Sequence, residues 1–239
     1  MFRPTGHFAT IQRSSGFSRR RIQVAQSPYE NVPVGEWEQT TLALLRQHPL
    51  KPEEVVEVVL GSWNAIFASA LGNYHIGKDI FPKPQIMGFF LHELIALEFK
   101  SRYPTIWRGD ESGKEKDLVC ITTPEKSVEL KCSSHKSKIF GNRSYAQAQT
   151  DPKKSKSGYY IAINFEAFKK GVSKNPGIIK IRFGWLDHTD WVGQKSQTGQ
   201  QASLKADSER YKLRTLFGAG VVQPGEDIFD LLAGDDAFG

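Results

Sequence analysis

The sequence predicts a mixed α/β (α+β) fold, in which a central mixed sheet follows an N-terminal helical addition. Two observations predict it. Apolar residues recur at helical spacing up to about residue 102, and from about Tyr103 the pattern changes to the short apolar runs of β-strands. Strand and helix patterns then alternate without an internal repeat, which is typical of one layered core.

Three helices are expected in the first half of the chain. The helical pattern covers residues 35–47 and 52–71, the second with Val55, Val59 and Trp63 on one face. A third helix is expected over residues 85–102, with Pro84 near its start, where a helix tolerates proline.

Strand patterns dominate the second half. Residues 117–121 and 128–132 flank the turn TTPEKS and predict an antiparallel hairpin. A short helix with Asn142 as N-cap is expected over 142–149. The remaining expected elements are strands at 103–107, 158–165 and 177–186, a helical turn at 166–171, a polar connection at 187–204 and a last helical piece at 208–217.

These patterns predict four regions along the chain. They are a flexible basic N-terminal arm (1–30), an N-terminal helical region (31–83), a core with its loops (84–217) and an acidic C-terminal tail (218–239). The arm has five Arg against one Glu, and residues 220–239 have five acids and no base. A transit peptide is an alternative for the Arg- and Ser-rich start.

Composition excludes several classes of protein. The chain has 239 residues, is 39% hydrophobic and 24% charged, and contains no apolar run near the roughly 20 residues that span a bilayer. The start lacks the apolar segment of a signal peptide. Cys120 and Cys132 lie in strand-like runs and predict buried, reduced thiols. We therefore expect a cytoplasmic, bacterial-type intracellular protein without a membrane partner.

Basic charge is concentrated next to one strand. The net charge is +6, and residues 131–156 alone hold seven Lys and Arg against Asp151. Such a cluster is compatible with a polyanionic partner but does not identify it.

An acid and a lysine two residues apart occur in three places. Glu98 and Lys100 lie on a predicted helix, where positions two apart do not share a face. Asp151 and Lys153 flank a proline in a polar loop. Only Glu129 and Lys131 lie on an apolar strand, where both point to the same face.

The strand before this pair opens with a further acid, Asp117. Adjacent strands can bring Asp117, Glu129 and Lys131 together. Two carboxylates suit Mg²⁺, which can activate a bound water, and Lys131 can orient that water or help to deprotonate it. These groups are the ones that phosphodiester hydrolysis needs.

A third carboxylate is expected from the helix over 85–102. The neighbours of Glu93 one turn away are Phe89, Phe90, Ala96 and Leu97, so we expect Glu93 to point inward and to need a ligand. The alternative is a glutamate satisfied by an arginine. Glu98 is expected on the surface, and His92 is expected to be structural.

The segments HELIALEF, GKEKDLVCI, SVELKCSS and GNRSYAQ together resemble the PD-(D/E)xK nuclease superfamily, and within it the type II restriction endonucleases of the ScaI-like group. The resemblance implies a restriction-endonuclease-like αβββαβ core and Mg²⁺-dependent cleavage of double-stranded DNA at a short palindrome by a homodimer. Mn²⁺ is expected to substitute for Mg²⁺.

The resemblance also assigns roles. Asp117 and Glu129 carry over as metal ligands, Lys131 as the residue that activates water, and Glu93 as the helix acid. Lys116 departs from the pattern, because a proline usually precedes the first aspartate.

DNA-binding candidates follow the catalytic strand and lie in a later glutamine-rich loop. Lys and Ser suit phosphate contacts, whereas Asn, Gln and Arg can contact base edges. A solvated loop is the alternative for both segments. The candidates are Ser133, Ser134, His135, Lys136, Lys138, Asn142, Arg143, Ser144, Gln147, Gln194, Lys195, Gln197, Gln200 and Gln201. Trp185 and Trp191 are expected to pack in a core or a dimer interface.

Two rival functions remain open. A Holliday junction resolvase or repair nuclease of the same fold would share every catalytic residue. A non-catalytic DNA-binding module would use Glu129 and Lys131 as an exposed ion pair, worth only about 0–1 kcal/mol. The chain has no Gly-rich phosphate loop, so no nucleotide cofactor is expected.

Overall fold

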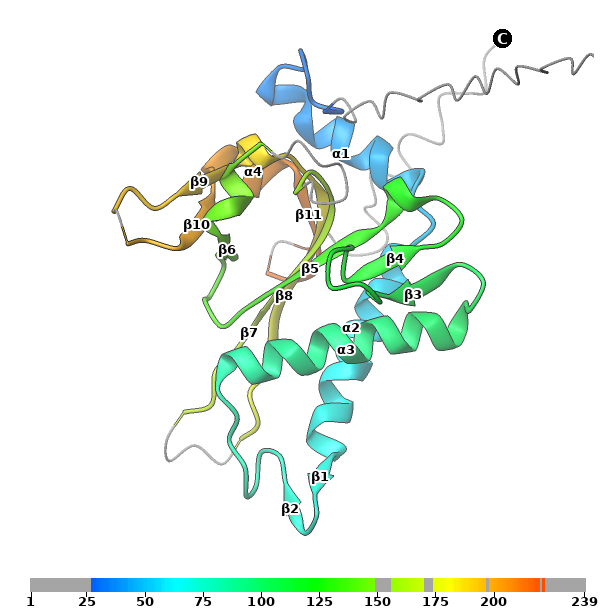
Figure 1. Ribbon diagram of the computed structural model, residues 1–239, viewed down its shortest axis with the longest axis vertical. Helices are drawn as coiled ribbons and strands as arrows, with labels where there is room; N and C mark the ends of the chain where they lie inside the picture. Colours follow the sequence, from blue (N-terminus) through cyan, green and yellow to red (C-terminus); the bar gives the residue numbers. More distant parts are fainter. Residues whose placement is uncertain (1–26, 149–155, 170–173, 197, 220, 222–239) are drawn as a thin grey trace, which may run out of the picture.

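The computed structural model describes residues 27–148, 156–169, 174–196, 198–219 and 221 (Figure 1). Most of the predicted basic arm and almost all of the acidic tail therefore lie outside the described residues. No helix in the described part of the chain has the length and apolarity needed to cross a membrane.

The three predicted helices are present, with small changes at their ends. A 3₁₀ turn, Val34–Glu36, leads into α1 (Trp37–Arg46), followed by α2 (Pro52–Ala68) and α3 (Pro84–Arg102). Pro52 and Pro84 stand at the starts of their helices, where their missing N–H has no intrahelical partner to lose. α2 ends before residue 71 because Ala70–Leu71 (β1) pairs with Tyr74–His75 (β2) in a small hairpin.

The centre of the fold is a six-stranded mixed sheet in the order β11-β8-β7-β5-β4-β3. β5 and β7 are parallel, and every other neighbouring pair is antiparallel. The strands are β3 (Trp107–Gly109), β4 (Leu118–Cys120), β5 (Val128–Ser133), β7 (Gly158–Phe165), β8 (Ile178–Leu186) and β11 (Leu213–Gly218). The expected strand at 103–107 thus begins only at Trp107.

Two apolar clusters cover the two faces of this sheet. Tyr159, Ile161 and Ile163 of β7 belong to the larger cluster with the helices, and Tyr160 and Ala162 belong to the smaller one. Successive strand residues point to opposite faces, which explains why all of β7 is buried and why its sequence is almost continuously apolar. Trp185 and Trp191 pack in these clusters, as expected.

A second, three-stranded antiparallel sheet lies on the side of the long strands opposite α1 and α2 (Figure 1). It contains β6 (Phe140–Asn142), β9 (Trp191–Gly193) and β10 (Gln201–Leu204) in the order β6-β10-β9. The prediction of a polar connection over 187–204 is therefore wrong. Each strand has at most one fully buried residue, Trp191 in β9 and Ala202 in β10, so its sequence lacks the apolar run of a buried strand.

Two further helix predictions are corrected. Residues 143–146 form a 3₁₀ turn, and Asn142 precedes it without a side-chain capping hydrogen bond. The helical piece at 208–217 is a short helix, α4 (Ala206–Tyr211), followed by strand β11. β11 pairs closely with β8: a Cβ at Gly184 would lie 1.8 Å from the Lys212 carbonyl oxygen. Of the helical turn expected at 166–171, residues 166–169 are not helical and the rest lies outside the described residues.

Candidate active site

The hairpin of β4 and β5 brings the predicted acids together. Leu118 pairs with Val128, so the antiparallel register places Asp117 level with Glu129. Val128 and Leu130 are buried in the larger apolar cluster, so Glu129 and Lys131 occupy the opposite face. Asp117 Oδ2 accepts a 2.7 Å hydrogen bond from the Leu130 backbone N–H, which ties the aspartate to the neighbouring strand.

Glu129 is a buried carboxylate surrounded by donors. Its side chain is 8% exposed. Lys131 Nζ lies 2.8 Å from Oε1, the Tyr145 hydroxyl donates to the same oxygen, and Lys116 Nζ lies 3.6 Å from Oε2. Burial alone would raise the pKa of Glu129, but the two ammonium groups outweigh burial and lower it, so the carboxylate is ionised at neutral pH.

Lys131 is a proton donor in this arrangement. Burial favours the neutral amine, but Glu129 outweighs burial and raises the pKa of Lys131 above its ordinary value. Its Nζ also donates to the Leu130 carbonyl oxygen at 3.1 Å. A protonated Lys131 can orient a water or stabilise negative charge, but it cannot accept a proton.

Lys116, the residue that departs from the sequence motif, reaches the same carboxylate. Its ammonium is buried and makes no hydrogen bond to the described residues, although it lies 5.0 Å from the centre of the Tyr160 ring. Burial lowers the pKa of Lys116. Two lysines therefore face one glutamate, where the sequence motif predicts only one.

α3 contributes His92 to the site, whereas Glu93 is exposed. Gly88 allows α3 to pack closely against β5, because a Cβ at this position would lie 3.3 Å from Cys132 Cβ on β5. One turn later, His92 Nδ1 lies 3.6 Å from Asp117 Oδ1. Burial lowers the pKa of His92, but the neighbouring Asp117 and Cys132 side chains outweigh burial and raise it to about 10.

The prediction that Glu93 points inward is wrong for a physical reason. Its apolar neighbours Phe89 and Leu97 are 57% and 58% exposed, so the apolar helix face that they form is not packed against the rest of the described chain. Glu98 is a surface acid as expected and pairs with Arg102 at 2.8 Å.

The groups around Asp117 provide oxygen ligands for a hard cation. They are the carboxylates of Asp117 and Glu129 and the Leu130 carbonyl, and Lys131 Nζ contacts the last two. Oxygen ligands of this kind suit Mg²⁺, so the residues fit a divalent cation. Within the described residues, no group of three or more His, Cys, Asp and Glu side chains is placed to hold a metal. A metal here would therefore depend on the carbonyl and on water.

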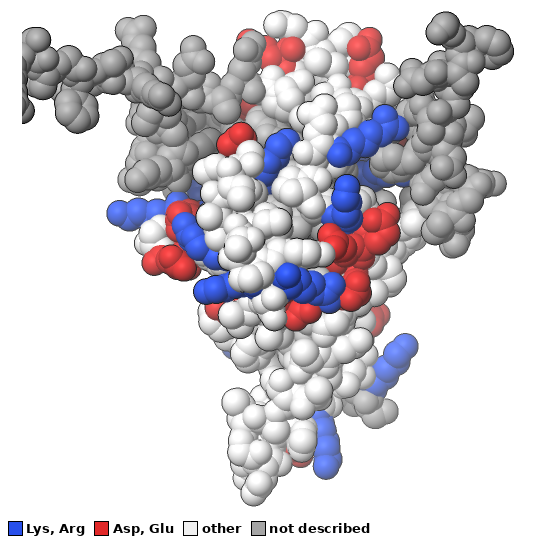
Figure 2. All heavy atoms as spheres, turned by 90° about the vertical axis from the view of Figure 1, so that its right-hand side faces the viewer, with Lys and Arg blue, Asp and Glu red and all other residues white. Residues whose placement is uncertain are grey.

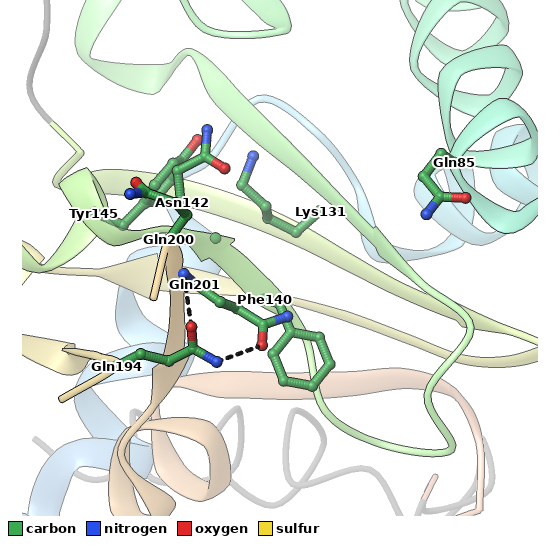
Figure 3. Close-up of a pocket in the computed structure, with 9 residues that line it drawn as sticks. Gln85, Lys131, Phe140, Asn142, Tyr145, Gln194, Gln200 and Gln201 are labelled. Carbon is green, nitrogen blue, oxygen red and sulfur yellow. Dashed lines mark hydrogen bonds between the residues drawn. The ribbon is translucent and has the colours of Figure 1, made fainter. Parts of the chain in front are cut away.

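Two adjoining cavities open beside Lys131. The first, of about 630 Å³, lies between the start of α3 and the small sheet (Figure 3). Its lining includes Lys131, Asn142, Gln194, Gln200 and Gln201. The second, of about 850 Å³, includes Lys131, Ser133, Ser134, His135 and Gln201. The structure thus brings seven of the DNA-binding candidates next to the predicted catalytic lysine.

Other candidates lie elsewhere. Arg143 binds the Ser196 and Gly199 carbonyls at 3.3 and 3.4 Å and so supports the glutamine-rich loop. Gln197 lies outside the described residues. The candidates that do not line either cavity are Lys136, Lys138, Arg143, Ser144, Gln147 and Lys195.

Figure 2 shows the side of the molecule that lies on the right in Figure 1, and this side carries both acidic and basic side chains. Acidic and basic side chains lie next to each other there. The ion pairs Arg102–Glu98, Arg102–Glu57 and Arg108–Glu115 join side chains of α2, α3 and the segment around β3. Acidic and basic side chains are interspersed on the described part of this face, so it does not present the continuous basic area that a polyanion favours.

Among known protein families, the one described as ScaI restriction endonuclease matches residues 27–217. The chain belongs to the ScaI restriction endonuclease family. It is 45% identical over 214 residues to "Type II restriction enzyme ScaI" of Streptomyces caespitosus, which covers 89% of this chain and 94% of that relative. No solved structure matches the chain.

In this member of the ScaI family, two buried polar residues hold the loop after β5. Asn164 of β7 donates to the His135 and Lys138 carbonyls at 2.8 and 3.0 Å. Arg182 of β8 donates to the Ser137 carbonyl at 2.5 Å and to Asn164 Oδ1 at 2.9 Å. The sheet therefore fixes the backbone of the loop that carries the cavity-lining His135.

Sequence reasoning missed Gln85 and Tyr145, expected His92 to be structural, and gave Lys116 no role in the site. Lys116 was visible as a departure from the motif, but the strand pattern gives no direction for its side chain. Tyr145 and Gln85 reach the site only through the folding of distant segments, so no local signal identifies them.

Proposed function

We propose that this chain is a type II restriction endonuclease that hydrolyses phosphodiester bonds of double-stranded DNA at a short palindrome. Membership of the ScaI family supports site-specific DNA cleavage. The observation that carries the catalytic assignment is the hydrogen bond from the Leu130 N–H to Asp117. It joins the acid of one strand to the Glu129–Lys131 pair of the next.

In this proposal, Asp117 and Glu129 hold Mg²⁺, and Mn²⁺ substitutes for it. Bound Mg²⁺ would supply an activated water and stabilise negative charge on the phosphate. Lys131, which is protonated, orients the water and neutralises charge on the scissile phosphate. His92 fixes the Asp117 carboxylate. Glu93 is not proposed as a ligand, because it is exposed.

Two acids and a lysine on neighbouring strands favour membership of the PD-(D/E)xK superfamily. The order α3, β3, β4, β5 and β7, with β7 parallel to β5, is compatible with a restriction-endonuclease-like core. The 3₁₀ turn Arg143–Ala146 stands where an αβββαβ core would have its second helix.

DNA is proposed to lie across the two cavities. Ser133, Ser134 and His135 would contact the backbone near Lys131, and the exposed Lys136 and Lys138 would extend that contact to neighbouring phosphates. Asn142, Gln194, Gln200 and Gln201 would face the bases.

A homodimer is proposed because a palindrome presents the same sequence to two copies of one chain. The exposed apolar face of α3, formed by Ile86, Phe89 and Leu97, is a candidate contact between the copies. Sedimentation of wild type and of Leu97→Glu, which places a charge in this face, tests the assignment, and the variant should dimerise less. A wild-type protein that binds its DNA site as a monomer would contradict it.

The decisive experiment is the incubation of the protein with plasmid DNA of mixed sequence and Mg²⁺, followed by gel electrophoresis. Discrete fragments are expected. Lys131→Ala should abolish them, whereas Lys51→Ala, which removes an exposed lysine at the start of α2, should leave them unchanged. Smearing or cleavage only of junctions would instead favour another nuclease of the same fold. Binding without cleavage, equal in wild type and Lys131→Ala, would favour a non-catalytic DNA-binding module.

A further inference from the structure

The cavity of Figure 3 is lined mainly by carboxamides. Five of its nine lining residues are Gln or Asn, none of the nine is acidic, and one is Lys131. A ligand among these carboxamides would therefore lie beside the proposed catalytic lysine. The five are Gln85, Asn142, Gln194, Gln200 and Gln201.

The small sheet explains why Gln201 faces this cavity. Ala202 is 1% exposed and packs in the smaller apolar cluster, so the neighbouring Gln201 points to the other face of β10. Gln201 pairs with Asn142 of β6 in the antiparallel register, and directly paired residues share a face. Two carboxamides are therefore aimed into the cavity by the strand geometry itself.

Gln194 holds Gln201 in place. The Gln194 backbone N–H donates to the Gln201 carbonyl at 2.8 Å, and the Gln201 backbone N–H donates to Gln194 Oε1 at 3.3 Å. Gln194 Nε2 also lies 3.5 Å from Gln201 Oε1 and donates to it (Figure 3). Gln201 Nε2 makes no hydrogen bond to the described residues. The pair thus presents a fixed carboxamide with a free donor and an acceptor with a remaining lone pair.

We propose that Gln201, oriented by Gln194, reads an adenine of the recognition sequence in the major groove. This inference rests on the proposed function. A carboxamide donates to adenine N7 and accepts from the adenine N6 amino group, and no other base offers this combination on its major-groove edge. Guanine presents two acceptors there, so it leaves the Gln201 oxygen unpaired. Lysines bound to phosphates cannot provide this discrimination, because they contact every sequence alike.

The test begins with the wild-type enzyme, whose site is mapped from the ends of fragments of a random-sequence library. kcat/KM is then measured for wild type and Gln201→Ala on that site and on its single base-pair variants. For Gln201→Ala, kcat/KM on the intact site should fall roughly ten- to hundredfold. The variant should also tolerate other base pairs at one A·T position of each half-site. Gln47→Ala, which removes an exposed carboxamide at the end of α1, is the matched control and should match wild type.

A change in the DNA tests the contact without touching the protein. Replacing each adenine of the site in turn by 7-deazaadenine removes the N7 acceptor. At one adenine position, this replacement should slow cleavage by wild type several-fold. The same replacement should not change the cleavage rate of Gln201→Ala, because the variant no longer makes the contact. A merely structural role of Gln201 would not remove this sensitivity.

Each other outcome overturns the inference. A loss in Gln201→Ala that is equal for all base-pair variants would make Gln201 a structural or phosphate-contacting residue. Insensitivity of wild type to every 7-deazaadenine would exclude the N7 contact even if Gln201→Ala does not fold. If wild type cuts no DNA, the proposed function is overturned together with the inference. If wild type cuts DNA but fails the tests above, only the assignment of Gln201 is wrong.

Discussion

Replacing Lys116 by Met should strengthen the binding of a divalent cation at Glu129. Lys116 Nζ lies 3.6 Å from Glu129 Oε2, and Lys131 already contacts the other oxygen at 2.8 Å. A cation that binds Glu129 therefore approaches two positive charges. A unit positive charge at a comparable distance from the Lys116 ammonium would be repelled by roughly 5 kcal/mol at an effective dielectric constant of about 20. Relief of only a third of such a repulsion strengthens binding roughly tenfold.

Titration calorimetry of the DNA-free protein with Ca²⁺ or Mg²⁺ measures this effect directly. Met keeps the length of the lysine stem, and Lys100→Met provides an exposed lysine as control. The free energy of unfolding should change by less than about 2 kcal/mol, because the loss of the ion pair is offset by no longer burying an ammonium without a hydrogen-bond partner. If folded Lys116→Met binds the cation no more tightly than wild type, Lys116 does not oppose the metal, and the reasoning about Glu129 as a ligand fails.

Three further predictions follow from buried polar groups. His92→Ala should strengthen cation binding roughly tenfold, because it removes a protonated imidazole 3.6 Å from Asp117 Oδ1, whereas Glu93→Ala should bind the cation like wild type; the same calorimetry decides. Asn164→Ala should remove the hydrogen bonds that hold the loop after β5, so it should weaken DNA binding more than it lowers kcat. Fluorescence anisotropy measures the dissociation constant, and an unchanged value would contradict this prediction. The free energy of unfolding should fall by roughly 3 kcal/mol as the pH drops from about 6.5 to about 4. The reason is that burial lowers the pKa of His48 to about 4 in the folded protein, whereas an unfolded histidine binds a proton throughout that window. Thermal unfolding of His48→Gln should lack this part of the pH dependence.

The large sheet was predictable where strands are apolar on both faces. Residues 158–165 match β7 at both ends, because strands buried on both faces need an uninterrupted apolar run. The small sheet was not predictable in the same way. In β10 only Ala202 is fully buried, so the sequence of this strand resembles a polar connection. β11 was mistaken for helix because its pairing with β8 is a contact between segments distant in sequence.

The geometry of the hairpin of β4 and β5 was predictable because it depends on local sequence. Asp117, Glu129 and Lys131 lie on consecutive strands joined by a short turn, and alternation alone determines which side chains share a face. Tyr145 and His92 reach Glu129 and Asp117 from a turn and a helix whose positions depend on the packing of the whole domain. Single-sequence patterns contain no information about such distances.

The error about Glu93 has a consequence for assembly. Helical periodicity shows that Phe89, Glu93 and Leu97 share a face, but it does not show what covers that face. An inward-pointing Glu93 requires the interior of the same chain to cover this face, whereas Phe89 and Leu97 are more than half exposed. Large apolar side chains grouped on an exposed helix face usually mark a contact with another molecule. The pattern that misplaced Glu93 as a metal ligand therefore supports the proposed homodimer, in which this face of α3 would be buried against a second copy.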